Sequence, residues 1–74
     1  MDQAKIGRFI AERRRAQGLT QQALAEALGV SNRTVSKWEC GGGLPEVANI
    51  LPLCALLDVT ADELLRGSSD REGK

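Results

Sequence analysis

The sequence predicts an all-α fold, a compact bundle of five short helices. Apolar residues recur at spacings of three and four, helix-capping residues stand before several of these segments, and glycines follow them. No segment shows the apolar and polar alternation of a strand. Since 42% of the 74 residues are hydrophobic, the chain can bury one small core. We therefore expect one domain over residues 1–67 and a polar, disordered tail over residues 68–74.

The first helix is expected over residues 4–17. Ile6, Phe9 and Ile10 fall on one face of this segment, as in a helix that buries one side. Gly18 follows the segment, and a glycine there readily adopts the positive φ that ends many helices.

Two further helix starts follow, eleven residues apart, at Thr20 and Ser31. Each hydroxyl is placed to accept a hydrogen bond from a first-turn N–H group that lacks a helical partner. Gly29 comes directly after Leu28 and is expected to end the first of these helices. Two short helices joined by so tight a turn predict a helix-turn-helix, formed by the second and third helices. This motif places a helix in the DNA major groove.

The second helix of the motif has one apolar and one polar side. Val35 and Trp38, three residues apart, face the core. The outward residues can all donate hydrogen bonds, and they are Asn32, Arg33, Ser36 and Lys37. Arginine matches guanine and asparagine matches adenine in the major groove, whereas Lys37 suits either a base or a phosphate. This side is therefore a candidate groove-reading surface.

These motifs resemble the Xre/Cro family of helix-turn-helix DNA-binding domains, which includes the lambda-type phage repressors. The resemblance spans residues 6–67 and is carried by an ordered set of segments: Gly18-Leu19-Thr20-Gln21, Leu24-Ala25, Leu28-Gly29-Val30-Ser31, Val35-Ser36-Lys37-Trp38-Glu39, Leu44-Pro45 and Asp62-Glu63-Leu64-Leu65.

The resemblance implies a function, transcription regulation as a repressor, and a set of site residues. Gln21 would cap the first motif helix and touch DNA phosphate, and Asn32, Arg33 and Lys37 would reach base edges. The residues expected at double-stranded DNA are Thr20, Gln21, Gln22, Ser31, Asn32, Arg33, Ser36, Lys37 and Gly42.

Arg14 is expected to pair with Glu39 inside the domain. Arg14 lies four residues after Ile10, on the inward stripe of the first helix, where an unpaired charge would be costly. The resemblance also implies this ion pair. Arg14 is therefore expected to brace the fold rather than contact DNA.

The segment from Cys40 to Pro45 is expected to be a loop, because it contains three consecutive glycines. Its open backbone would allow a phosphate to approach Gly42, although the segment would serve equally well as a linker. Many members of the family carry polar or charged side chains at the positions of Cys40, Gly42 and Gly43.

The apolar segment after this loop contains Pro52, which cannot donate to the carbonyl four residues before it. A helix capped by Asn49 and starting at Ile50 would place Pro52 in the first turn, where no N–H is needed. The resemblance also allows a longer helix with a distorted start, because some members share a proline here.

The last helix has a capping box, in which Thr60 precedes Glu63 by three residues, and Gly67 is expected to end it.

The formal net charge is zero, but the charges are divided along the chain. Residues 1–39 hold seven basic and four acidic side chains, a net +3, and residues 40–74 hold three basic and six acidic ones, a net −3. Because salt screens charges beyond about 8 Å, such a dipolar domain can still present a positive surface to DNA.

Catalysis, metals and cofactors are not expected. The chain has no His and no Tyr, and its glycines lack the lysine and the preceding strand of a phosphate-binding loop. Cys40 and Cys54 make neither a zinc site nor a disulfide framework, and we expect two reduced thiols, with Cys54 in the core and Cys40 partly exposed. No apolar run reaches the ~18 residues that span a bilayer, which predicts a cytoplasmic protein without a membrane partner.

The domain is expected to pair on DNA, and one alternative function stays open. One recognition helix offers few contacts, so we expect a weak homodimer on a palindromic DNA site, paired through residues 64–68. The alternative is a protein-interaction module on the same fold, such as an antitoxin or a transcriptional co-regulator. Trp38 would be its exposed anchor, but the spacing from Val35 favours a core position for Trp38, and the polar helix favours DNA.

Overall fold

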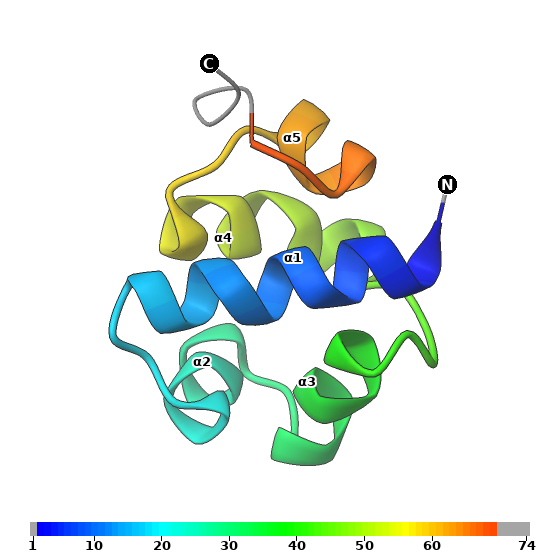
Figure 1. Ribbon diagram of the computed structural model, residues 1–74. Helices are drawn as coiled ribbons and strands as arrows, with labels where there is room; N and C mark the ends of the chain where they lie inside the picture. The colour runs from blue at the N-terminus through cyan, green and yellow to red at the C-terminus, as the bar shows by residue number, and fades with distance from the viewer. Residues whose placement is uncertain (1, 70–74) are drawn as a thin grey trace.

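The computed structural model describes residues 2–69, which form five α-helices and no strand (Figure 1). In order, the helices are α1 (Gln3–Ala16), α2 (Gln21–Leu28), α3 (Asn32–Glu39), α4 (Val47–Leu57) and α5 (Ala61–Arg66). The all-α five-helix bundle expected from the sequence is confirmed. None of the helices in this part of the chain is long and apolar enough to cross a membrane.

Helix α1 lies across the middle of the bundle, with α2 and α3 below it and α5 above it (Figure 1). It packs against α3, α4 and α5, while α2 packs against α3 and α4. All five helices contribute to one apolar core, whose fully buried side chains are Ile6, Ile10, Leu24, Val35, Leu53, Leu57 and Leu64. The motif helices α2 and α3 are thus fixed to the rest of the domain by shared packing.

The predicted helix caps account for five of the ten helix ends in the described residues. The hydroxyl groups of Thr20, Ser31 and Thr60 each accept a backbone N–H from the first turn of the following helix. Gly29 and Gly67 end α2 and α5 in the left-handed conformation, with φ of 76° and 72°. The three hydroxyl groups accept N–H groups that have no partner at the start of a helix, and the N–H groups of the two glycines donate to carbonyls in the last turn.

The start of α4 differs from the expectation. The helix begins at Val47 rather than Ile50, so Asn49 lies inside it and Pro52 is its sixth residue. Pro52 cannot donate to the carbonyl of Ala48, but both residues are exposed, and water can bond this carbonyl. The loss of one hydrogen bond on the solvent side is therefore outweighed by the apolar packing of the opposite side. The prediction of a cap at Asn49 was wrong, and the longer helix that the resemblance allowed is the one formed.

Helices α1 and α3 come into close contact at Gly7, which the sequence analysis did not single out. A Cβ atom at Gly7 would overlap the carbonyl oxygen of Trp38 and lie 2.9 Å from that of Glu39. Only glycine fits between the two backbones at this point. A glycine inside a regular helix lowers the stability of the helix, so its presence usually indicates that a neighbouring element packs closely against it. The glycine within the first predicted helix was therefore the sequence signal for this contact.

Two contacts fix the C-terminal parts of the fold. The Arg13 guanidinium donates from Nε and Nη2 to the carbonyl of Leu57, at 3.2 and 3.1 Å, and so caps the last turn of α4. Ser68 N donates to the Glu63 carbonyl at 3.2 Å, and Ser69 Oγ donates to Glu63 Oε2 at 3.4 Å. The expected tail begins with these two bonded serines, and its residues 70–74 lie outside the described part of the chain.

Candidate nucleic-acid interface

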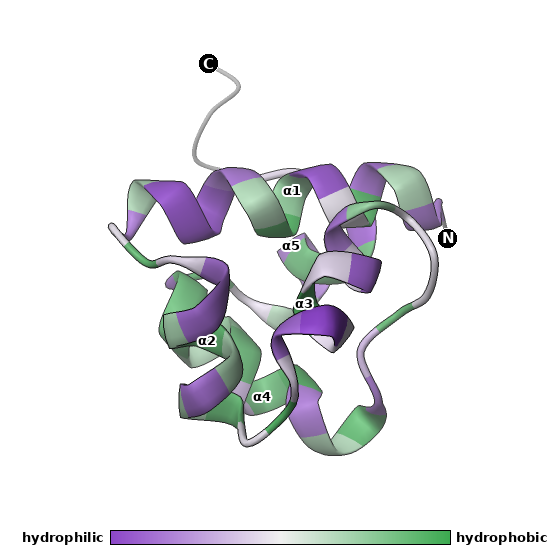
Figure 2. Ribbon diagram, turned by 90° about the horizontal axis from the view of Figure 1, so that it is seen from below, coloured by the Kyte–Doolittle hydropathy of each residue, from purple (hydrophilic) through white to green (hydrophobic). Residues whose placement is uncertain are grey.

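Helix α3 has one buried and one exposed side. Val35 and Trp38 are buried in the core, whereas Asn32, Arg33 and Lys37 are exposed. Viewed from the side of α2 and α3, the α3 ribbon carries mostly the colours of hydrophilic and intermediate residues (Figure 2). The predicted groove-reading residues are therefore brought together on one accessible surface.

The first turn of α3 is held firmly by its cap. Ser31 Oγ accepts the N–H of Thr34 at 3.1 Å and shares a hydrogen bond with Thr34 Oγ1 at 2.9 Å. Ser31 Oγ thus already makes two hydrogen bonds within the domain. Within residues 2–69 the side chains of Asn32 and Arg33 have no hydrogen-bond or ion-pair partner, so their donors are available to a ligand. Ser36 is half-buried and contributes less to the accessible surface.

Arg14 and Glu39 lie in contact between α1 and α3. Arg14 Nε donates to Glu39 Oε2 at 2.6 Å, Nη2 donates to Oε1 at 3.1 Å, and Nη1 donates to the carbonyl of Leu19 at 2.8 Å. Arg14 is only 9% exposed. The hydrogen bond to Glu39 and its negative charge raise the pKa of Arg14 against the opposing effect of burial. The pair is a bidentate, charge-assisted link that holds α3 against α1.

Gln21 joins the same carboxylate. Its Nε2 donates to Glu39 Oε1 at 2.9 Å, so the side chain of Gln21 is turned toward the ion pair. An amide nitrogen carries two hydrogens, which leaves the second one free to donate to a ligand. The carboxylate of Glu39 therefore orients the group that the sequence analysis assigned to DNA phosphate.

The other candidates at the start of α2 also bond within the protein, and Gln22, like Gln21, keeps a second amide hydrogen. Thr20 Oγ1 accepts the N–H of Ala23 at 2.9 Å, and Gln22 Nε2 donates to Glu26 Oε2 at 3.0 Å, four residues along the helix. The N-terminus of α2 nevertheless carries the positive end of the helix dipole, and the first-turn N–H groups of Gln21 and Gln22 point out of the helix.

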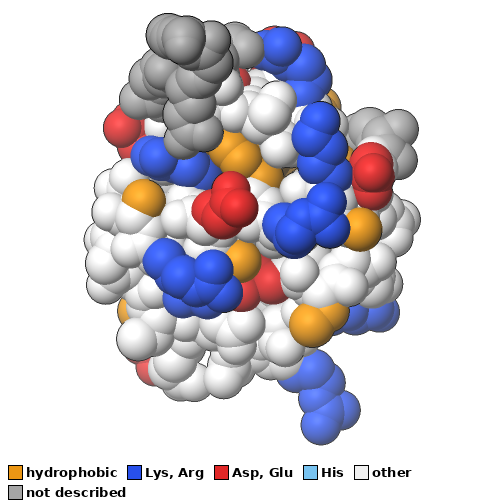
Figure 3. Space-filling model, in the orientation of Figure 1, with side chains coloured by type: hydrophobic (Ala, Val, Ile, Leu, Met, Phe, Trp, Pro, Cys, Tyr) orange, Lys and Arg blue, Asp and Glu red, His pale blue; other side chains and the backbone are white. Residues whose placement is uncertain are grey.

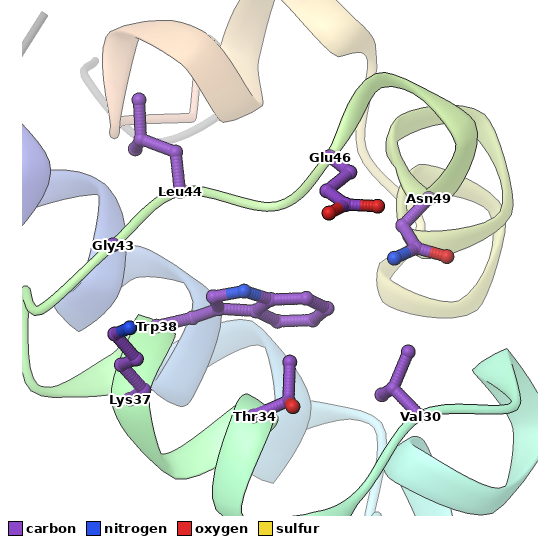
Figure 4. Close-up of a pocket in the computed structure, with 8 residues that line it drawn as sticks. All are labelled: Val30, Thr34, Lys37, Trp38, Gly43, Leu44, Glu46 and Asn49. Atoms are coloured by element: carbon purple, nitrogen blue, oxygen red, sulfur yellow. The ribbon is translucent and has the colours of Figure 1, made fainter.

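A hollow with a volume of about 320 Å³ lies between α3, the following loop and α4. Figure 4 shows the indole ring of Trp38 across this hollow, with Lys37 and Thr34 on one side and Glu46 and Asn49 on the other. The backbone of Gly42 is exposed beside it, but the N–H of Gly42 already donates to the carbonyl of Lys37 at 2.9 Å. Gly42 therefore offers an open backbone without a free donor.

Basic side chains are not gathered into one patch on the side of the molecule that carries α1. Figure 3 shows them spread over this side with acidic side chains between them, and a basic side chain stands out at the lower edge, where α3 lies. Cys54 is buried and Cys40 is exposed, as expected. Burial and the nearby charge of Glu63 raise the pKa of the Cys54 thiol.

Comparison with known proteins identifies this arrangement. A helix-turn-helix family model matches residues 10–64 of the chain. The chain belongs to this helix-turn-helix family. The resemblance to lambda-type repressor domains is also confirmed, since the chain is 36% identical over 67 residues to the transcriptional regulator DicA of Escherichia coli, covering 90% of the chain and 50% of DicA.

Two further curated relatives are transcription regulators by name. The chain is 44% identical over 54 residues to the transcriptional activator BcrR of Enterococcus faecalis, covering 73% of the chain and 26% of BcrR. It is 35% identical over 60 residues to the phage transcriptional repressor RstR of Vibrio cholerae, covering 81% of the chain and 54% of RstR. The chain thus spans about half of these relatives or less.

Solved structures extend the likeness to the whole helix-turn-helix bundle. The P22 c2 repressor in complex with a synthetic operator superposes with a TM-score of 0.80 at 36% identity, covering 85% of this chain and 96% of that one. The restriction-modification controller protein C.AhdI of Aeromonas hydrophila superposes with a TM-score of 0.76 at 36% identity, with the same coverage.

Proposed function

We propose that this domain binds double-stranded DNA sequence-specifically and regulates transcription, as a repressor. The observation that carries the proposal is the exposed surface of α3, where Asn32, Arg33 and Lys37 stand on a helix whose other side is fixed in the core. Similar proteins support it, since RstR is a transcriptional repressor and the P22 c2 repressor was crystallised with operator DNA. In a bacterium such a regulator would act in the cytoplasm, where the DNA lies.

In this mechanism α2 positions the domain and α3 reads the sequence. The first-turn N–H groups of α2 and the second amide hydrogen of Gln21 donate to a phosphate, which sets the register without reading bases. Arg33 and Asn32 then contact base edges in the major groove, where arginine recognises guanine and asparagine recognises adenine. Since Arg14 and Glu39 brace α3 against α1, the phosphate contacts and the reading helix move as one body.

Two copies of the domain would bind a palindromic site as a weak homodimer. A twofold pair doubles the base and phosphate contacts, and it places the half-site centres about 34 Å apart. Leu64 is fully buried and Leu65 is 41% exposed, so the expected pairing surface at the end of α5 presents one large apolar side chain. Two other large apolar side chains are exposed on α4, where Val47 is 90% and Leu51 is 72% exposed.

Selection of bound sites from random duplex DNA, with the wild type and Arg33→Ala, tests the function. The wild type should enrich a palindrome, and Arg33→Ala should lose about 1–3 kcal/mol of discrimination at one base pair of each half-site. Lys5→Ala is the control for base preference, because Lys5 lies on α1 beside Gly67 and not on the motif helices. It adjoins the expected pairing surface, so it can change the affinity but should leave the preferred bases unchanged. If the wild type enriches no duplex, the function is wrong and the protein-interaction alternative is favoured.

A further inference from the structure

Trp38 carries a hydrogen-bond donor that has no partner in the protein. The residue is only 4% exposed, and within residues 2–69 its indole N–H donates to no acceptor. No fully buried side-chain nitrogen in this part of the chain lacks a partner, so the indole nitrogen reaches the surface. Trp38 lines the hollow between α3 and α4, and Figure 4 shows the nitrogen at the ring edge below Leu44 and Glu46. Because the N–H of a buried tryptophan normally has an acceptor, we look for that acceptor in the hollow.

Two charges of opposite sign line the same hollow. Lys37 belongs to α3, Glu46 directly precedes α4, and Figure 4 shows them on different sides of the Trp38 ring. Across the described residues neither side chain makes a salt bridge, either with the other or with a third group. Glu46 is the N-cap residue of α4, yet its carboxylate makes no capping hydrogen bond. Both charges are therefore available to a ligand.

The rest of the hollow suits a small molecule with an apolar part. Val30 and Leu44 are half-buried apolar side chains, and the half-buried amide of Asn49 makes no hydrogen bond in the part of the chain that the structure describes. The volume is about 320 Å³, at the small end of the range for ligand sites. Since liquid water takes about 30 Å³ per molecule, this space holds roughly ten non-hydrogen atoms. That is the size of a free amino acid.

We propose that the hollow binds a small zwitterion, a free α-amino acid. Its carboxylate pairs with Lys37 and accepts the indole N–H of Trp38, and its ammonium group pairs with Glu46. The two charges of the site select this class of ligand. A phosphate would lie against the carboxylate of Glu46, and a simple amine would leave both Lys37 and the indole N–H without an acceptor.

Such a ligand would weaken DNA binding, a consequence that rests on the proposed function. Lys37 is one of the cations on the exposed side of α3, and a carboxylate on its ammonium group neutralises the charge that it offers to DNA. DNA in turn weakens binding of the amino acid by the same factor, because coupling between two binding sites is reciprocal. The amino acid would therefore act as an inducer of a repressor.

The intrinsic fluorescence of the protein reports on this site, because Trp38 is its only tryptophan and the chain has no tyrosine. The test titrates the protein with each of the common L-amino acids, using calorimetry for tyrosine and tryptophan, which fluoresce themselves. At least one should give a saturable signal. Its N-acetyl and amide derivatives, which each lack one charge, should bind about tenfold more weakly. The absence of a saturable signal with every amino acid in the millimolar range would overturn the proposal.

Variants with matched controls show where the amino acid binds. Glu46→Gln and Lys37→Met each remove one charge of the hollow and should weaken binding about tenfold in calorimetry. Glu12→Gln and Lys5→Met make the same changes on α1, outside the hollow, and should keep the affinity of the wild type. Thermal melts check that each variant is folded. Wild-type affinity in both hollow variants, or equal losses in the controls, would show that the amino acid binds elsewhere.

DNA titrations separate this site from the function on which its consequence rests. The amino acid should weaken binding of the wild type to its selected duplex, and the same concentration should have little effect on Glu46→Gln. If the amino acid binds without changing the affinity for DNA, the role as an inducer is wrong. If no amino acid binds and Glu46→Gln strengthens DNA binding, the hollow faces DNA and the proposal is overturned. If the wild type binds no duplex but still binds the amino acid, the ligand site is supported and the DNA-binding function is wrong.

Discussion

Replacing Gly7 by alanine should destabilise the domain, although alanine is the better helix former. The added methyl group would overlap the carbonyl oxygen of Trp38 and press on that of Glu39, two backbone atoms that cannot rotate away. Overpacking of this kind costs about 1–3 kcal/mol, and a rigid backbone neighbour places the cost near the upper end. Against this cost, alanine stabilises the helix by about 1 kcal/mol relative to glycine. The expected net loss is therefore about 2 kcal/mol of the unfolding free energy, from the difference of these two effects.

Thermal unfolding followed by circular dichroism measures this loss. For a domain of this size about 1 kcal/mol corresponds to roughly 4–8 °C, so Gly7→Ala should lower the melting temperature by about 8–16 °C. Ala27→Gly is the matched control, because Ala27 is exposed on α2 and reports the helix-propensity effect alone. It should lower the melting temperature by about 4–8 °C, since the propensity difference is about 1 kcal/mol. A melting temperature of Gly7→Ala equal to or above that of the wild type would refute the close approach of α1 and α3.

Three further predictions concern the interface and its support. Either Arg14→Ala or Glu39→Ala should cost about 3–5 kcal/mol of the unfolding free energy, because each leaves the other charge buried without its charged partner. The double variant should lose less than the sum of the two in denaturant titrations, and strict additivity would contradict the pairing. Gln21→Ala should weaken binding to all duplexes about equally in a competition assay, and a changed base preference would show that the residue reads sequence. A thiol reagent should modify Cys40 in the native protein but reach Cys54 only on unfolding, because Cys54 is buried and its raised pKa keeps the thiol protonated. Mass spectrometry of the partly labelled protein measures this difference, and equal labelling rates would contradict it.

The sequence predicts the local parts of this structure well, because capping is a matter of neighbouring residues. Thr20, Ser31 and Thr60 act within three residues of themselves, so their hydroxyls and the following helices could be recognised directly. The start of α4 was mispredicted, because the cost of Pro52 inside a helix depends on which side faces water, and that is a tertiary property.

The exposed side of α3 and the pair of Arg14 with Glu39 were predictable from the sequence, whereas the bond of Gln21 to Glu39 was not. The exposed side of α3 follows from helical periodicity, which places Asn32 and Arg33 opposite Val35. The attachment of Gln21 to Glu39 joins residues eighteen apart, and the contact of Gly7 with α3 depends on how closely two helices approach. Neither contact can be recognised from a short sequence pattern, so both became visible only in the three-dimensional structure.

The carboxylate of Glu39 has a consequence for how such a domain can change its target. One side chain receives donors from both Arg14 and Gln21, so α1, α2 and α3 meet at a point that is remote from Asn32 and Arg33. Substitutions in the first turn of α3 therefore leave the joint between the three helices untouched. If Asn32 and Arg33 read the DNA sequence as proposed, substitutions at these two exposed positions would change the preferred operator while the folded frame stays the same.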